Sequence, residues 1–436
     1  MNTTPTDQTN LFDIPAYKRS RSAYCLHCAF EYFIALLVSD AFLAKLLSNL
    51  GFSDMLIGVT SSIISAAFLF QLSAILLVRK IRSVKRYVIT LSFLSQLLFV
   101  SLYLIPFLPV SASMKSVLVI VFLAMAYFCL YSMGPMLAQW GNSYVAPTNR
   151  GTYSAVKEII SLLSGMAFTL GMGYVIDIYE GLDNLRGGFL FIACAGLIVS
   201  LCSFTCLKSI SAQNAAATPD SEQIPMREVF RGTLGSRRFI PVVVASCLMS
   251  ISSYMTVGFL GIFKTKDLML SVATVQIINI AGNLARAALS KPLGRFSDKH
   301  SFAKGLEVGF FIDAAAFAFC AFSGPGTIWC IVVFTILHAV SAAGTNQNSF
   351  NILYSYVDQK YFVQAYAIKC SISGVIGFLA SLVGSAILGA VQANGNSLFG
   401  MTVYGQQVLA AISLLFSVAA ALYTHFVLGR QKVTLQ

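Results

Sequence analysis

The sequence predicts an all-α integral membrane protein with twelve transmembrane helices in two pseudo-symmetric bundles of six helices each. Three observations support this fold class. Hydrophobic residues make up 57% of the 436 residues and charged residues only 11%, which is too little charge to cover a soluble globule of this length. Apolar stretches long enough to cross a hydrocarbon layer of about 30 Å recur from one end of the chain to the other. The two halves of the sequence also resemble each other.

Each predicted span supplies the roughly 20 apolar residues that a helix needs to cross the layer. The spans are expected near 22–49, 54–78, 87–107, 115–140, 152–176, 186–207, 240–262, 269–290, 303–323, 326–349, 361–390 and 402–428. A polar stretch after the sixth span marks the one obvious domain boundary. The chain is therefore divided into a cytoplasmic N-terminal tail (1–21), a first six-helix bundle (22–207), a cytoplasmic linker (208–239), a second six-helix bundle (240–428) and a cytoplasmic C-terminal tail (429–436).

An internal repeat relates the two halves. Ser143-Tyr144-Val145 recurs as Ser355-Tyr356-Val357, and each copy runs directly into a hydrophobic helix. The further identities between 143–170 and 355–382 are Ala155/Ala367, Lys157/Lys369, Ile160/Ile372, Ser161/Ser373, Gly165/Gly377 and Leu170/Leu382. Repeated bundles that face each other are how many membrane carriers build a binding site between the bundles.

The net charge is +12, and the distribution of the basic residues agrees with the predicted topology. With a cytoplasmic N-terminus, most of the 29 basic residues fall on the cytoplasmic side, for example in 18–21, 79–86 and 237–238. Arg286 alone lies well inside a span. The charge therefore indicates membrane orientation rather than nucleic-acid binding, and both termini are expected to be cytoplasmic. We expect the plasma (cytoplasmic) membrane of a bacterium as the location.

We expect neither a cleavable signal peptide nor a metal site in the N-terminal region, and we expect no cofactor. The first twenty residues are polar and end in a basic anchor, so the first span is expected to stay in place. Cys25 and Cys28 have the spacing of a metal or redox motif, but they open an apolar helix and lack a second ligand pair. Most of the ten cysteines fall inside predicted spans, where cysteine behaves as a small hydrophobic residue. Within the linker, 225–231 is expected to form a short amphipathic helix on the inner leaflet.

A loop signature follows the eighth predicted span. Gly294, Asp298 and Lys299 match the pattern Gly-x-x-x-Asp-(Arg/Lys)-x-Gly-(Arg/Lys)-(Arg/Lys), while Ser301 replaces the second glycine and Lys304 alone remains of the terminal basic pair. This loop resembles the signature of the major facilitator superfamily. The stretch 147–151 is similar to the Pro-x-x-Arg-Gly sequence that precedes helix 5 in that family.

The resemblance implies the fold of that family and a conformational latch made of Gly294, Asp298 and Lys299. Asp298 would clamp helix 11 against helix 8 in the outward-facing state, because an aspartate can accept hydrogen bonds from the unpaired N–H groups at a helix N-terminus. The corresponding stretch 76–86 of the first half has neither the glycine nor the aspartate. A symmetric latch is therefore not expected there.

Ionisable residues in the first predicted helix are candidates for proton coupling. Each costs about 2.5–3.5 kcal/mol near mid-membrane, so it needs a partner, a wet cavity or a function. Glu31 and Lys157 lie at similar depth and are able to pair, and His27 lies one turn from Glu31. Either these residues couple protons or they form a structural ion pair. The family resemblance makes Asp40 or Glu31 the carrier of a coupling proton without choosing between them.

The eighth predicted helix carries a polar stripe of Gln276, Asn279, Asn283 and Arg286, spaced so that all four share one face. In the family that the loop resembles, this helix lines the cavity. Two interpretations stay open. The stripe binds a hydroxylated or anionic solute through amide hydrogen bonds and the guanidinium fork, or it is amide packing between helices.

Four further residues are assigned to the predicted substrate site. Lys157 and Lys369 are equivalent in the repeat, so if one faces the cavity we expect the same of the other. Together with Arg286 they would make the lumen electropositive, although lysines at this depth also reach back to the membrane surface. Tyr127 and Tyr131 on the fourth predicted helix are the remaining two. Asp313 in the ninth is interpreted as structural.

These patterns predict a secondary transporter that moves a small polar solute, anionic or hydroxylated, by alternating access with proton coupling. The chain has no ATP-binding Gly-x-x-x-x-Gly-Lys-(Ser/Thr) loop, and its four histidines are dispersed, so neither direct ATP drive nor an enzyme is expected. Proton-driven efflux of amphipathic drugs and a transporter-like membrane sensor without flux are the alternatives. The expected partners are membrane lipid, the solute and the proton, with no nucleic acid, and the chain is expected to be a monomer.

Overall fold

The structure, a computed structural model, describes residues 14–38, 40–52, 67–77, 81, 83–212, 228, 233–235, 237–270, 272–398 and 401–430. The chain forms two compact units. The first contains Met1–Ala146 and Ile160–Ile224, and the second contains Pro147–Ile159 and Pro225–Gln436. One long helix, α8 (Arg150–Gly181), therefore begins in the second unit and continues in the first.

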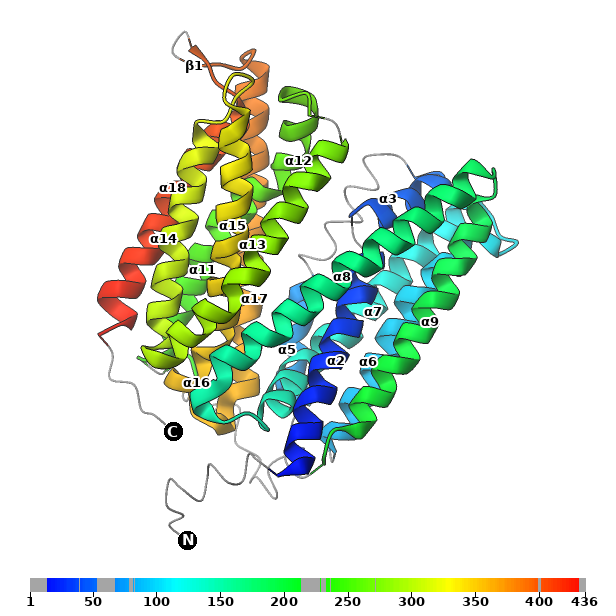
Figure 1. The fold of residues 1–436 in the computed structure, drawn as a ribbon, viewed down its shortest axis with the longest axis vertical. Coiled ribbons are helices and arrows are strands. Elements are labelled where there is room, and N and C mark those ends of the chain that lie inside the picture. The colour runs from blue at the N-terminus through cyan, green and yellow to red at the C-terminus, as the bar shows by residue number, and fades with distance from the viewer. Residues whose placement is uncertain are drawn as a thin grey trace. The chain divides into compact units, whose positions relative to one another are not determined.

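The described residues of the first unit form long and short helices (Figure 1). Its elements are α2 (Pro15–Leu37), α3 (Asp40–Asn49), η1 (Phe68–Gln71), α5 (Leu72–Leu77), α6 (Val84–Ser101), η2 (Leu102–Phe107), α7 (Ala112–Asn142), the rest of α8, and α9 (Leu185–Ser209). Its core is apolar and aromatic, with Leu46, Tyr103 and Phe189 almost fully buried. The Tyr103 hydroxyl donates to the Leu37 carbonyl at 2.5 Å, which satisfies a buried polar group beside the end of α2.

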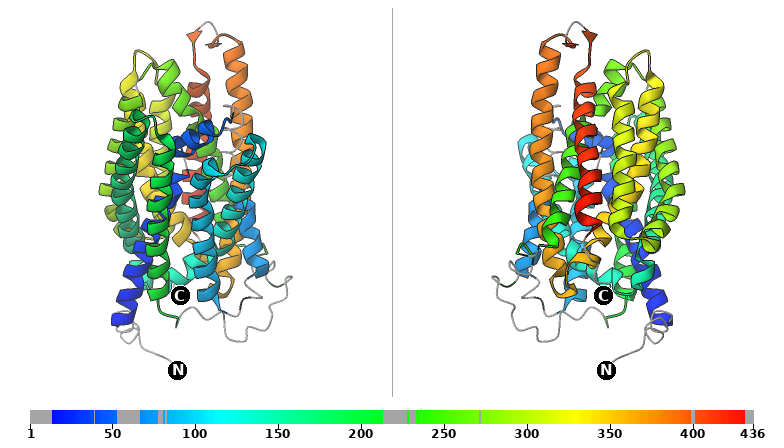
Figure 2. Two further views of the ribbon diagram at one scale, coloured as in Figure 1. Left: turned by 90° about the vertical axis from the view of Figure 1, so that its right-hand side faces the viewer. Right: turned by 90° about the vertical axis from the view of Figure 1, so that its left-hand side faces the viewer.

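The second unit has the same kind of architecture. Its elements are η3 (Pro147–Asn149), the start of α8, α11 (Phe239–Thr256), η5 (Val257–Phe259), α12 (Leu260–Ile262), the π-helical turn η6 (Phe263–Asp267), α13 (Val272–Lys299), α14 (Phe302–Ala321), α15 (Ile328–Asn351), α16 (Leu353–Tyr356), η7 (Gln359–Tyr361), α17 (Phe362–Ala393), β1 (Ser397–Leu398), β2 (Met401–Thr402), α18 (Gly405–Tyr423) and the π-helical turn η8 (Thr424–Leu428). Helix α14 packs between α15 and α18 (Figure 1). The small antiparallel pair β1–β2 connects α17 to α18, the orange and red helices of Figure 2.

The helix ends follow from the local sequence. Ser83, Ser111, Asn184 and Ser301 cap α6, α7, α9 and α14 by accepting a hydrogen bond from a backbone N–H of the first turn. Ser301 is the residue that replaces the second glycine of the loop signature, so this departure has a structural role. Pro15 begins α2, in the position where a missing N–H costs nothing.

Most of the predicted spans coincide with helices of the described residues. Eight helices of the described residues are long and apolar enough to cross a membrane. Helices α2 and α13, of 23 and 28 residues, are long enough but more polar, and α14, of 20 residues, is apolar but carries Lys304, Glu307 and Asp313. The predicted span 22–49 is broken between α2 and α3, where Asp40 opens α3 because aspartate favours a first turn over a helix interior. Most of 54–78, and the predicted amphipathic helix 225–231 apart from Glu228, lie outside the described residues. The chain is a multi-pass integral membrane protein.

The internal repeat is visible in the packing of two glycines. A Cβ added to Gly165 in α8 would lie 2.5 Å from the ring of Tyr32 in α2, and one added to Gly377 in α17 would overlap the ring of Tyr254 in α11. Each repeat copy therefore uses an equivalent glycine to admit a tyrosine ring from another helix. Small residues of this kind let helices in lipid approach closely.

We expect alanine at Gly165 or Gly377 to lower the free energy of unfolding by about 1–3 kcal/mol, because the tyrosine ring must move to admit the methyl group. Thermal melting of the purified protein in detergent measures this. Gly171 in α8 and Gly389 in α17 are matched controls, since a Cβ there meets no atom within 4 Å. Alanine at the controls should leave the melting temperature unchanged or raise it slightly. Equal melting temperatures at all four positions would contradict the packing role.

Candidate functional site

An ion pair inside the second unit is the centre of the candidate site. Arg286 lies near the middle of the 28-residue helix α13, and Glu158 lies in the third turn of α8. The Arg286 Nε donates to Glu158 Oε1 at 2.7 Å, and the Nη2 group donates to the same oxygen. The side chains are only 22% and 14% exposed, so the pair is largely removed from the surface.

Two neighbouring side chains complete this cluster. Ser290, one turn after Arg286, donates to Glu158 Oε2 at 3.4 Å and to the Arg286 carbonyl at 2.7 Å. Gln347 from α15 donates to the Ser290 carbonyl at 3.4 Å. Both carboxylate oxygens of Glu158 therefore accept hydrogen bonds from α13, and α15 is joined to the cluster through its amide.

The polar stripe predicted on the eighth helix lies on α13. Asn279, Asn283 and Arg286 are half-buried, and Ser290 extends the same face by one turn. Gln276 belongs to the described backbone of α13, but its side chain lies outside the description. The two asparagines thus lie one and two turns from the ion pair, where their amides are able to donate to and accept from a bound molecule.

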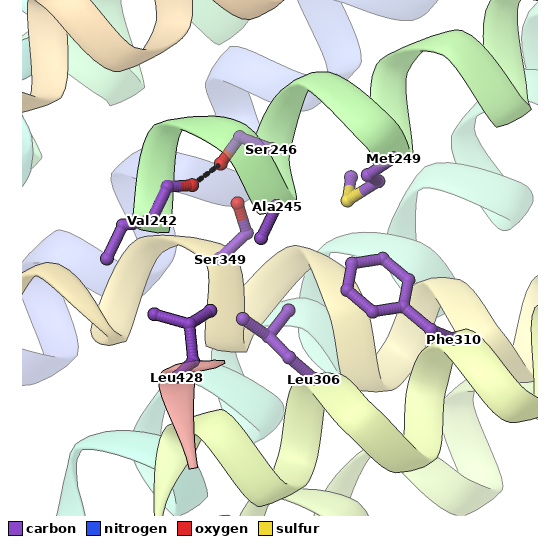
Figure 3. Close-up of a pocket in the computed structure, with 8 residues that line it drawn as sticks. All are labelled: Val242, Ala245, Ser246, Met249, Leu306, Phe310, Ser349 and Leu428. Carbon is purple, nitrogen blue, oxygen red and sulfur yellow. Dashed lines mark hydrogen bonds between the residues drawn. The ribbon is translucent and has the colours of Figure 1, made fainter. Parts of the chain in front are cut away.

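The two repeat-related lysines have different surroundings. Lys157 is half-buried beside Glu158 in the chain. Lys369 is only 4% exposed, and its ammonium group donates to the carbonyl and the hydroxyl of Ser349 in α15 at 2.7 and 3.0 Å. Ser349 also lines a small hollow whose other lining residues are Val242, Ala245, Ser246, Met249, Leu306, Phe310 and Leu428 (Figure 3). Six of these eight lining residues are apolar, and the polar groups come from Ser246 and Ser349.

The predicted tyrosines pack with other aromatic rings. Tyr127 and Tyr131 in α7 stack on each other with ring centroids 5.8 Å apart. Tyr127 is buried and packs edge-to-face with Phe99. The ring centroids of Tyr131 and Phe68 lie 4.8 Å apart. This places Tyr127 in the core of the first unit.

The three predicted proton-coupling residues, His27, Glu31 and Asp40, belong to the first unit, whereas Lys157, the predicted partner of Glu31, belongs to the second. His27 in α2 is fully buried, with Nδ1 2.8 Å from the hydroxyl of Ser203 in α9 and Nε2 3.9 Å from Glu31 Oε2. Gln96 of α6 donates to the same Ser203 hydroxyl at 2.9 Å. The structure therefore brings His27 and Glu31 together on one face. Asp40 begins α3, and its side chain lies outside the description.

Asp298, near the end of α13, accepts three hydrogen bonds from the start of α8. The backbone N–H of Gly151 donates to Oδ1, and the N–H and hydroxyl of Thr152 donate to Oδ2, each at 2.7 Å. The predicted partner of Asp298, helix 11, is therefore wrong. Helix 11 of the prediction is α17, whereas Asp298 binds α8, which is helix 5 of the prediction and the repeat equivalent of α17. Both α8 and α17 begin after the repeated Ser-Tyr-Val stretch, and the first turn of any helix has N–H groups without a partner in the helix. Asp298 binds the first turn of α8 and not that of α17.

Two glycines bring the backbones of α8 and α13 into contact at this point. A Cβ added to Gly294 would lie 2.6 Å from the Gly151 carbonyl oxygen, and one added to Gly151 would lie 2.7 Å from the Gly294 carbonyl oxygen. Neither position has room for a side chain. Lys299, the third predicted latch residue, is exposed.

Glu158 is the main functional candidate that the sequence analysis did not single out. The signal was present, since an acidic residue in the third turn of an apolar span is costly without a partner. Arg150 is a second charged residue that the sequence analysis did not single out. Its guanidinium carbon lies 3.8 Å from the centroid of the Tyr354 ring. Among the residues that the structure describes, no three His, Cys, Asp or Glu side chains are grouped to hold a metal ion.

We expect Asp298→Ala to lower the free energy of unfolding by about 1.5–3 kcal/mol, because it removes hydrogen bonds between a charged acceptor and the first turn of α8. Thermal melting in detergent checks this. Lys299→Ala, an exposed neighbour, is the control and should melt like the wild type. The contact has no energetic role if the two variants melt together.

Comparison with known proteins identifies the architecture. No family model matches the chain, and no curated protein matches it. Solved structures do match over nearly the whole chain. The E. coli fucose:proton symporter is 14% identical with a TM-score of 0.69, covering 97% of this chain and 100% of its own. A bacterial homologue of the iron transporter ferroportin is 13% identical with a TM-score of 0.69, covering 94% and 99%.

The name of a third similar structure includes its family. It is a major facilitator superfamily proton:xylose symporter, 14% identical with a TM-score of 0.62, covering 94% of this chain and 96% of its own. Each of these names refers to a transporter and none to an enzyme. The chain therefore has the fold of the major facilitator superfamily, as the loop signature and the repeat predicted.

Proposed function

We propose that this protein is a secondary transporter that moves a small polar organic solute, anionic or hydroxylated, by alternating access coupled to protons. The observation that carries the proposal is the Arg286–Glu158 pair, held largely buried on the polar face of α13. Each charge costs about 2.5–3.5 kcal/mol in a membrane span, so a pair that only packed helices would be replaceable by apolar residues. The fold supports the proposal, because two of the similar structures are proton symporters of sugars.

The chemistry of the pair suggests how solute and proton would be linked. Glu158 occupies the guanidinium fork of Arg286, so an anionic solute has to compete with a carboxylate of the same chain. Protonation of Glu158 removes its negative charge and leaves Arg286 available to the solute. Proton and anion then bind cooperatively, and a net neutral load enters the site. Asn279 and Asn283 would supply the hydrogen bonds that select a hydroxylated molecule.

The other predicted residues enter the proposal at lower rank. Glu31 with His27, and Asp40, are the alternative proton carriers in the first unit. Lys157 and Lys369 would add positive charge, and Tyr127 and Tyr131 would contribute aromatic contacts. Gly294, Asp298 and Lys299 would act as the latch, now between α13 and the start of α8. We further propose a monomer in the plasma membrane of a bacterium, with both termini cytoplasmic.

The first step of the test identifies the solute. A thermal-shift screen of the purified protein against sugars, organic acids, amino acids and nucleosides identifies ligands, since a molecule that binds the folded state raises the melting temperature. Any ligand found is then used in counterflow with reconstituted vesicles. Counterflow of a polar ligand supports a transporter. Binding without counterflow would favour a membrane sensor, and binding of amphipathic drugs alone would favour efflux.

We expect Arg286→Ala to reduce solute uptake by at least about 100-fold, because the anchoring charge is lost and Glu158 is left unpaired. Arg286→Lys keeps the charge but not the fork and should retain a small part of the activity. Uptake of labelled solute into vesicles measures both, with Lys291→Ala on the exposed side of α13 as control. Wild-type uptake in Arg286→Ala would remove this residue from the site.

Glu158→Gln separates coupling from binding. Glutamine keeps the size and hydrogen-bonding capacity of the side chain but carries no titratable proton, so we expect solute exchange to continue while uptake driven by a pH gradient falls by about tenfold or more. Glu31→Gln is the matched variant for the alternative proton carrier. If Glu31→Gln loses gradient-driven uptake and Glu158→Gln does not, the coupling role belongs to the first unit.

A further inference from the structure

A second polar network lies in the second unit, on helices other than α8 and α13. Asp313 of α14 and His338 of α15 are joined by a hydrogen bond of 2.8 Å between Oδ1 and Nδ1. The hydroxyl of Ser417 in α18 donates to the other carboxylate oxygen at 3.0 Å. All three residues lie near the middle of their helices, far from either end.

Hydroxyl groups continue this network to a fourth helix. Ser252 of α11 lies with its hydroxyl 2.6 Å from that of Ser417, and it also donates to the Ser413 carbonyl at 3.1 Å. The Asp313 side chain is 7% exposed and that of His338 is 26% exposed. The imidazole stacks on Phe334, with ring centroids 5.3 Å apart and planes inclined by 14°. One chain of hydrogen bonds thus runs from a partly exposed imidazole to a carbonyl group inside the unit.

The direction of these hydrogen bonds can reverse without leaving a polar group unsatisfied. With Asp313 ionised, Ser417 donates to the carboxylate, and the Ser252 hydroxyl donates to Ser417 or to the Ser413 carbonyl. With Asp313 protonated on Oδ2, the carboxyl donates to Ser417, which donates to Ser252, which donates to the Ser413 carbonyl. A hydroxyl both donates and accepts, so the same three side chains fit either state.

Charge also favours the uptake of one proton by this network. A neutral histidine beside an ionised aspartate carries a net charge of −1, which is costly in an apolar helix bundle. One added proton makes the pair neutral overall, whether it resides on the imidazole or on the carboxyl group. A purely structural contact between two helices needs only one fixed pattern of hydrogen bonds. Here four helices supply acceptors and donors for two patterns.

Two charged groups on elements near the network, Lys264 and Glu307, have partners of their own. Lys264 of η6 donates to Thr335, one turn before His338 on α15, at 3.2 Å. Glu307, earlier on α14, is paired with Lys304 at 3.2 Å and with His425 of η8 at 2.9 Å. The other charged or titratable side chains that the described parts of α11, α13, α14, α15 and α18 carry are Cys247, Tyr254, Arg286, Lys291, Arg295, Asp298, Lys299, Cys320, Cys330 and Tyr423.

We infer that Asp313 and His338 form a proton-binding site that takes up one proton, with Ser417 and Ser252 reversing their hydrogen bonds when it binds. This site is separate from the Arg286–Glu158 pair, and it departs from the purely structural role that the sequence predicted for Asp313. The inference does not depend on the proposed transport function, because proton binding is measured without solute or flux.

Infrared difference spectroscopy of the full-length protein in lipid nanodiscs tests this inference. Spectra recorded between about pH 5 and 8 cover the range in which an ordinary histidine side chain changes charge. We expect bands from a protonated carboxyl group or an imidazolium ion that are lost in both Asp313→Asn and His338→Gln. Unchanged difference spectra in both variants would overturn the inference, and so would a wild-type spectrum without such bands.

Two further variants guard against misfolding of the first pair. Ser417→Ala and Ser252→Ala keep both titratable groups but interrupt the hydroxyl chain. We expect each to shift the same bands while the melting temperature stays close to that of the wild type. A control variant, Ser323→Ala in the connection after α14, should leave the bands in place. Bands that do not shift in either serine variant would show that the hydroxyl chain takes no part, which contradicts the inference.

Discussion

The cost of charge inside a membrane span is the constraint on which the second unit depends. Its helices contain charged side chains that lipid does not tolerate singly, and the structure compensates each in a different way. Arg286 is paired with Glu158, Asp313 is bonded to His338 and Ser417, and Lys369 donates to two acceptors of Ser349. Because every one of these groups links different helices or different turns, neutralising charge and packing the bundle are one structural problem.

The position of α8 makes the first of these pairs possible. The helix begins where Gly151 and Gly294 bring the backbones of α8 and α13 into contact. At this point Asp298 accepts hydrogen bonds from the backbone N–H groups of the first turn of α8. From that point Glu158 follows within two turns and reaches the side chain of Arg286. The signature loop and the buried ion pair are therefore parts of one helix contact, since the glycines set the distance at which the charged side chains meet. A substitution in the loop would act on the ion pair through this shared geometry.

Much of the fold was predictable from the sequence, because apolar length and internal repetition are properties of the chain itself. The stripe on α13 was visible for the same reason, as helical spacing places residues on one face. Partners across helices were harder to predict. The repeat offers two equivalent helix starts for Asp298, and sequence cannot choose between them. The repeat marks Lys157 but not its neighbour Glu158, whose carboxylate binds Arg286. Nothing in the sequence shows that His338, on the next helix of the bundle, is the partner of Asp313.

Solute-driven proton movement in reconstituted vesicles decides whether this protein couples solute transport to protons. With a ligand from the binding screen applied outside and no imposed gradient, a pH-sensitive dye inside the vesicles reports whether protons enter with the solute. We expect acidification of the interior in the wild type and none in Glu158→Gln. Tight binding of the ligand with no change of internal pH in the wild type would contradict this expectation.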